Sequence, residues 1–121
     1  MIKTYKDLEV YQLSYKLAME IFELTKKFPK EERYSLIAQI RDSSRSIPAN
    51  IAEGWSKRCY ENVFKRQLID AAGSVDETKV WLDFSLDCKY ISKEIHKNLI
   101  GRYEKVGRKI YNLIENWKSY K

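Results

Sequence analysis

The 121-residue sequence is 44% hydrophobic, enough for one core, and it predicts a single domain over residues 1–121. Only 4 Gly and 2 Pro are present, too few for the many turns of a β-sheet protein. The formal charge of +6 allows contact with phosphate. Charged residues interrupt every apolar run that could cross a membrane or open a secretory leader. We therefore expect an all-helical, cytoplasmic protein without membrane contact.

The first predicted helix covers residues 6–27, where apolar side chains recur at three- and four-residue steps. Thr4 and Asp7 form a capping-box pattern at its start. Phe28-Pro29 follows its last turn, and proline does not continue a helix. The segment is thus expected to be one amphipathic helix with a defined beginning and end.

The second predicted helix opens at Pro29, which suits a first helical turn, and runs to Gly54, a residue type typical of helix ends. Pro48 lies inside this segment and removes one backbone hydrogen bond. The segment is therefore either one helix kinked near Pro48 or two helices that meet there. We favour the kinked helix, because polar side chains around Pro48 could satisfy the freed carbonyl.

A short connection over residues 55–60 precedes the third predicted helix, which ends near residues 87–90. Gly73 and Ser74 lie in its middle, where glycine is unfavourable, so we expect a neighbouring helix to approach closely there. Ser92 is the expected cap of the fourth helix. The fourth helix carries a nearly heptad series of apolar residues, namely Ile95, Leu99, Tyr103, Val106, Ile110, Leu113 and Trp117.

Four long helices joined by short links predict an antiparallel up-down-up-down four-helix bundle whose second helix is kinked near Pro48. The aromatic residues exceed what such a core can hold. Either half of them cover helix ends, or they form contacts between copies of the chain, and we favour self-association. The surplus consists of Tyr5, Tyr11, Trp55, Tyr60, Trp81, Phe84, Tyr90, Tyr111, Trp117 and Tyr120.

The residues required for catalysis or metal binding are missing from the sequence. A di-iron bundle needs two Glu-x-x-His motifs, but His96 is the only histidine. Cys59 and Cys88 form no CxxC pair, and no partner is evident that would orient a Cys88–His96 pair. There is also no glycine-rich phosphate loop. We expect no enzymatic activity, no metal and no cofactor.

Polar side chains are concentrated around Pro48 and in the middle of the third helix. We interpret them as a hydrogen-bond network that fixes helix register. The alternative is a polar pocket or a junction between subunits. The predicted network consists of Gln39, Ser46, Asn50, Glu53, Ser74 and Glu77, with Ser44 beside it.

Basic residues form two groups that could contact a phosphate backbone. Residues 92–121 contain 8 basic and 3 acidic side chains, so most of the excess charge lies there. The alternative for the first group is pairing with Asp42, Glu61 and Asp70. The first group is Arg41, Arg45, Lys57, Arg58, Lys65 and Arg66, and the second is Arg102, Lys105, Arg108 and Lys109.

Three segments resemble the conserved pattern of one family. Residues 46–54 (SIPANIAEG) match its most distinctive motif, and Phe28, Pro29, Glu32, Tyr34, Leu36 and Gln39 match its preceding segment. Residues 64–68 and 72–74 together with Glu77 match its third helix. The chain thus resembles the 23S rRNA intervening-sequence proteins, also called the S23 ribosomal protein family. It departs from them at Cys59-Tyr60, where members often have a small hydroxyl residue.

This resemblance implies a left-handed four-helix bundle that assembles as a homopentamer. Members are often encoded within insertions in bacterial large-subunit rRNA genes. The family is related to the accessory variability protein of diversity-generating retroelements, a basic pentamer that binds reverse transcriptase and nucleic acid. We expect a non-enzymatic pentamer that contacts RNA or DNA, or a nucleoprotein, through its basic surface. The alternative is an adaptor for a protein partner such as a reverse transcriptase.

Overall fold

The computed structural model describes residues 1–119, and these residues contain helices and no strand. A short 3-10 turn, η1 (Tyr5–Asp7), precedes α1 (Glu9–Thr25), and a second turn, η2 (Lys30–Glu32), precedes α2 (Leu36–Ser56). Two longer helices follow, α3 (Glu61–Asp87) and α4 (Lys93–Asn116). The predicted all-helical fold is confirmed.

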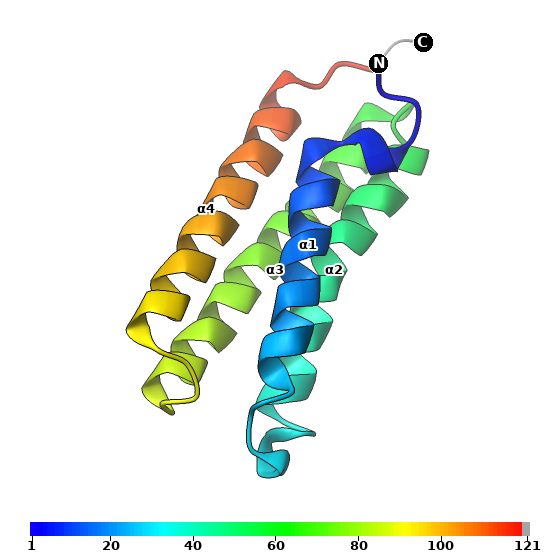
Figure 1. Cartoon of the computed structure of the whole chain (residues 1–121). Helices are drawn as coiled ribbons and strands as arrows, with labels where there is room; N and C mark the ends of the chain where they lie inside the picture. The colour runs from blue at the N-terminus through cyan, green and yellow to red at the C-terminus, as the bar shows by residue number, and fades with distance from the viewer. Residues whose placement is uncertain (120–121) are drawn as a thin grey trace.

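The four helices form an antiparallel bundle in which each helix packs against its neighbours in the chain (Figure 1). The contact between α1 and α4 closes the bundle, and both ends of the described chain lie at the same end of it. Short links permit only this arrangement, because a helix that turns back at once must lie beside its predecessor. The predicted up-down-up-down topology is therefore confirmed.

Helix α2 continues through Pro48 without interruption, so the alternative of two helices meeting there is wrong. Pro48 is buried, and one turn away Asn50 Nδ2 donates to the Ser46 carbonyl at 2.9 Å and to Ser46 Oγ at 3.0 Å. These bonds hold polar groups beside the missing backbone bond, which is how helices accommodate an internal proline. The kink itself stays a prediction.

The starts of two helices differ from the prediction. The capping box of Thr4 and Asp7 forms, but it caps η1, and α1 begins only at Glu9. Pro29 precedes the η2 turn and not the α-helix, because Ser35 adopts a non-helical backbone before α2. Ser92 does cap α4, with its side chain accepting from the Ile95 amide at 3.1 Å.

Two glycines, one in the last turn of α2 and one in the middle of α3, differ from their expected roles. Gly54 was expected to end a helix, yet it lies buried inside α2, where an added Cβ would be 2.8 Å from Gln67 Cβ. Gly73 was expected at a close approach of helices, yet an added Cβ would meet nothing within 4 Å. The close approach therefore occurs between α2 and α3 at Gly54, and the expectation for Gly73 is wrong.

The core is built from apolar residues of all four helices, and Ile21, Ile40, Phe64 and Tyr103 are among its fully buried members. Part of the aromatic surplus covers one end of the bundle, where Trp117 packs edge-on against the rings of Trp55 and Phe64. Another part is exposed, namely Tyr60, Phe84 and Tyr111, whereas Tyr120 lies outside the described residues. In the described part of the chain, no helix is long and apolar enough to span a bilayer.

Candidate nucleic-acid interface

The predicted basic residues differ in how many contacts they make with other residues of the chain. Arg41 is the most constrained, because its Nε donates to Thr25 Oγ1 at 2.9 Å and its Nη2 to the Phe22 carbonyl at 3.3 Å. Its guanidinium also lies 4.6 Å from the centre of the Phe22 ring. Arg41 therefore binds α2 to α1, and a phosphate would have to compete with these contacts.

Lys57, Arg58 and Lys65 surround the turn between α2 and α3. Lys57 Nζ lies 2.9 Å from a Glu53 carboxylate oxygen, and Lys65 Nζ lies 3.1 Å from Glu61. The Arg58 guanidinium lies 4.4 Å from the Trp55 ring and donates to the Trp55 carbonyl at 2.9 Å. Each of these three cations thus has a partner within the chain.

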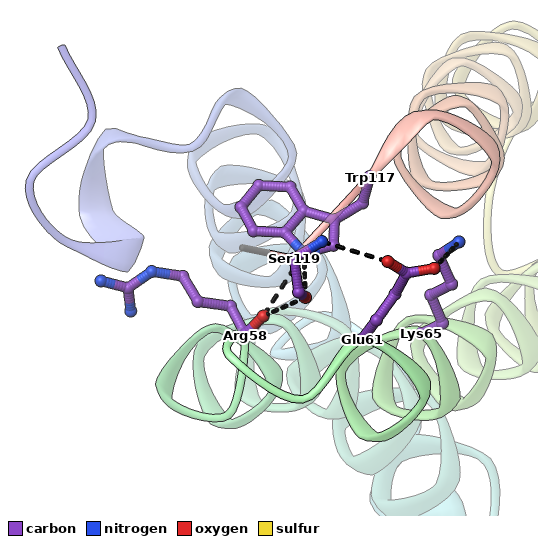
Figure 2. Close-up of polar contacts among 5 residues, drawn as sticks. All are labelled: Arg58, Glu61, Lys65, Trp117 and Ser119. Carbon is purple, nitrogen blue, oxygen red and sulfur yellow. Dashed lines mark hydrogen bonds and ion pairs between the residues drawn. The ribbon is translucent and has the colours of Figure 1, made fainter. Parts of the chain in front are cut away.

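The segment that follows α4 is attached to the same turn (Figure 2). Ser119 Oγ donates to the Arg58 carbonyl at 2.6 Å, and the Ser119 amide donates to Glu61 at 3.1 Å. The Ser119 amide, and then the Lys65 side chain, lower the pKa of the Glu61 carboxyl. Glu61 therefore stays ionised and partly neutralises Lys65. Its contacts connect the segment after α4 to the turn between α2 and α3.

Two basic residues of α4 bind α1. Arg102 makes a bidentate contact with Glu20, with Nη1 2.7 Å from Oε1, and Lys109 Nζ lies 2.6 Å from Glu9. The hydrogen bond from Arg102 lowers the pKa of the Glu20 carboxyl, and that from Lys109 lowers the pKa of the Glu9 carboxyl. These two cations connect α4 to α1.

Six of the predicted cations make no ion pair within residues 1–119. Arg41 and Arg58 are held by the hydrogen bonds and ring contacts described above. The other four are exposed, namely Arg45, Arg66, Lys105 and Arg108. Lys105 and Arg108 lie one turn apart on α4 and line a groove between α3 and α4. Arg45 lines a separate groove between α1 and α2, and Arg66 lies on α3. The structure thus brings together only part of the predicted basic surface.

The groove between α3 and α4 is mixed in charge but mainly basic. Lys79, which the sequence analysis did not single out, enters it from α3 and lies 3.8 Å from Glu104 and 3.9 Å from Asp76. Lys79 therefore offsets only part of the charge of these two carboxylates, whereas Lys105 and Arg108 make no ion pair among the described residues. Spacing along the sequence does not distinguish these two residues, because Arg102 and Lys105 are also three residues apart.

Part of the predicted polar network forms a chain of hydrogen bonds between α2 and α3. Ser74 Oγ donates to Ser46 Oγ at 3.0 Å, and Gln67 Nε2 donates to Asn50 Oδ1 at 2.9 Å. Lys57 extends the chain, because its Nζ donates to Glu53 at 2.9 Å and to Gln67 Oε1 at 3.3 Å. The network therefore fixes the register of α2 against α3.

The hydrogen-bonding residues between α2 and α3 differ in part from the predicted set. Gln67 is central to it but was overlooked, and so were Thr78 and Ser43, whose hydroxyls lie 2.9 Å apart. Gln39 is exposed in a groove near the start of α2, and Glu77 accepts from Trp81 Nε1 of its own helix at 3.1 Å. A list of polar residues could not find these pairs, because they depend on how α2 and α3 align.

No group of three metal-binding side chains occurs among the described residues. His96 Nε2 lies 2.8 Å from Asp83, and both cysteines are exposed free thiols. Ser44 bonds within its own helix, with Oγ donating to the Arg41 carbonyl at 3.1 Å. The polar chemistry that the structure offers is thus charge and hydrogen bonding at surfaces.

Comparison with known proteins connects this bundle to one family. Residues 6–112 match the family model described as 23S rRNA-intervening sequence protein. A similar solved structure is that of a protein with unknown function from the S23 ribosomal protein family of Bacteroides thetaiotaomicron. It is 25% identical, with a TM-score of 0.79, and the match covers 88% of this chain and 99% of that chain. No curated protein matches this chain.

Proposed function

Because this chain belongs to the family of 23S rRNA-intervening sequence proteins, we propose that it is a non-enzymatic cytoplasmic bundle that contacts RNA, alone or in a nucleoprotein. The family resemblance predicted from residues 46–54 is thereby confirmed. We assign the contact to the groove between α3 and α4. We further propose that the chain assembles with itself, and the family resemblance makes five copies the expected number.

The observation that supports the RNA contact is the pair of unneutralised cations on α4. Lys105 and Arg108 are exposed and point into one groove, whereas Arg102 and Lys109 of the same helix are paired with α1. Gly101, one turn before Lys105, is also exposed and has no neighbour near its Cα hydrogens. Phosphate groups could therefore bind Lys105 and Arg108 without displacing an ion pair within the chain, and sequence-independent binding depends on such contacts.

The test is fluorescence anisotropy of a labelled structured RNA, titrated with the protein over a series of salt concentrations. The double variant Lys105→Gln/Arg108→Gln removes both free cations. It should weaken binding at least tenfold at low salt, and it should reduce the slope of log affinity against log salt by about 1.5, because two phosphate contacts are lost.

The matched control is Lys57→Gln/Lys65→Gln, which removes the same charge from cations that already have partners. It should change affinity less than threefold. Equal losses in both double variants would assign binding to net charge and not to the groove. A flat, negligible signal for the unmodified protein would exclude RNA as the ligand.

A protein-binding adaptor is the second candidate, and the exposed aromatic residues favour it. Tyr60, Phe84 and Tyr111 are each more than half exposed, and aromatic residues are enriched at protein–protein interfaces. A reverse transcriptase would be one such partner. In that case RNA binding would be absent, and co-purification with the partner would survive high salt, because apolar contacts strengthen with salt.

A further inference from the structure

One face of α3 carries apolar side chains that are about half exposed. Ile69, Val80 and Phe84 are 55%, 48% and 52% exposed. At 3.6 residues per turn these residues lie on one line along the outer side of the helix, and Gly73 lies on the same line. We call these four residues the α3 ridge.

Gly73 requires an explanation that a single copy does not provide. Glycine inside a helix is unfavourable relative to alanine, and an added Cβ at Gly73 would meet nothing within 4 Å. Gly54 shows what a packing glycine looks like in this bundle, because its added Cβ would clash with α3. A glycine flanked by exposed apolar side chains therefore indicates close approach by another molecule.

A groove with a mainly apolar lining lies on a different face, between α1 and α2. Tyr15 and Met19 form one wall and Pro48, Ala49 and Ala52 the other. Tyr15 and Met19 are 52% and 46% exposed, so their apolar surface is uncovered. The small side chains of Ala49 and Ala52 would let a helix lie close to α2.

Charge decides between two arrangements of copies. Asp70, Asp76 and Glu77 lie on or beside the α3 ridge, together with Arg66 at its start and with Lys79, which pairs with Asp76. The net charge of this face is therefore acidic, and two ridges placed face to face would bring like charges together. The groove between α1 and α2 contains one charged residue, the exposed Arg45. The acidic side chains of the α3 ridge would thus attract Arg45 in the groove of a second copy, whereas they would repel the ridge of a second copy.

We propose that the α3 ridge of one copy docks into the groove between α1 and α2 of a second copy, with Arg45 facing the acidic edge of the ridge. The contact deepens the self-association proposed above by naming its surfaces. It is heterologous, because the two surfaces differ, and such contacts build rings when the rotation closes. Asp76 borders both surfaces, whereas Lys105 and Arg108 on α4 are not among the residues of the contact.

The first test is sedimentation velocity over a concentration series. Gly73→Gln adds a side chain on the ridge and should weaken self-association at least tenfold, while circular dichroism shows an unchanged fold. The matched control Gly101→Gln makes the same substitution at another open glycine, on α4, and should assemble like the unmodified chain. A monomeric unmodified protein, or normal assembly of Gly73→Gln, would overturn the proposal.

The second test separates heterologous from face-to-face pairing. In a Cys59→Ser/Cys88→Ser background, one sample carries Val80→Cys and another carries Ala49→Cys, and a short bismaleimide is added. Cross-linked dimers should form on mixing and not in either sample alone. Dimers in the Val80→Cys sample alone would refute the proposal. Arg45→Glu should weaken assembly at least fivefold, and unchanged assembly would refute the role of Arg45.

The two proposals fail in different ways. If Lys105→Gln/Arg108→Gln loses RNA binding but still assembles, the result bears on the RNA contact in the groove between α3 and α4 and leaves the docking proposal unaffected. If Gly73→Gln and Arg45→Glu leave assembly unchanged while RNA binding depends on salt, only the docking of the α3 ridge is refuted.

Discussion

The contact between α2 and α3 and the contact between α1 and α4 are stabilised in different ways. Between α2 and α3, the helices approach at Gly54 and hydroxyl and amide groups bond directly, as Ser46 does with Ser74. Between α1 and α4, long side chains reach across at the surface, as Arg102 does to Glu20 and Lys109 to Glu9. Short polar groups need a fixed helix register, whereas long ion pairs tolerate movement.

This difference predicts where the bundle is sensitive to substitution. Close packing leaves no space to relax, so a change in the α2–α3 seam should be costly. Exposed ion pairs contribute little and are screened by salt. The predictions below run from the largest expected effect to the smallest, and each one could contradict this contrast.

Gly54→Val should lower the free energy of unfolding by about 3 kcal/mol, because its side chain would overlap Gln67 and Phe64. The matched substitution Gly101→Val faces open space and should change it by less than about 0.5 kcal/mol. Urea unfolding followed by circular dichroism measures both values. Similar stability of the two variants would show that α2 and α3 are not closely packed.

Asn50→Ala should lower the free energy of unfolding by about 2 kcal/mol, because it leaves the Gln67 Nε2 donor without a partner in a half-buried contact and removes one of the two bonds that the Ser46 hydroxyl accepts. Asn112→Ala, at an exposed position on α4, serves as the control and should have almost no effect. The same urea titration compares them. An Asn50→Ala protein as stable as the control would mean that the network does not fix register.

Arg102→Met should cost less than about 1 kcal/mol at low salt, because the pair with Glu20 is partly exposed. The cost should shrink further in high salt. Since the pKa of the Glu20 carboxyl is lowered in the fold, the contribution of the pair is present at neutral pH and is lost as the pH falls through that pKa. Unfolding measured at several pH values should therefore show the variant and the parent converging in acid.

Tyr103→Phe should leave the free energy of unfolding within about 0.5 kcal/mol of the parent or raise it slightly. The Tyr103 hydroxyl is the one buried side-chain polar atom of the described residues that has no hydrogen-bond partner. Tyr90→Phe is the comparison, because the Tyr90 hydroxyl donates to Glu32 at 2.9 Å and its loss should cost about 1 kcal/mol. A large loss for Tyr103→Phe in thermal unfolding would reveal a bond that stabilises α4.

The candidate interface was predictable only in part. Clusters of lysine and arginine can be counted along the sequence, and the excess on the last helix was visible there. Which of these cations remain available was not, because Glu20 and Glu9, the partners of Arg102 and Lys109, lie far away in the chain. Lys105 and Arg108 stand out only once those pairs are known.

The sequence by itself determined the number, order and polarity of the helices, because apolar periodicity and helix caps act over a few residues. Only the tertiary structure decided which glycine meets a neighbouring helix. Gly54 and Gly73 have the same local chemistry, but Gly54 faces α3 while Gly73 faces outward. Propensity can place a glycine in a helix, whereas its role depends on how distant segments pack against it.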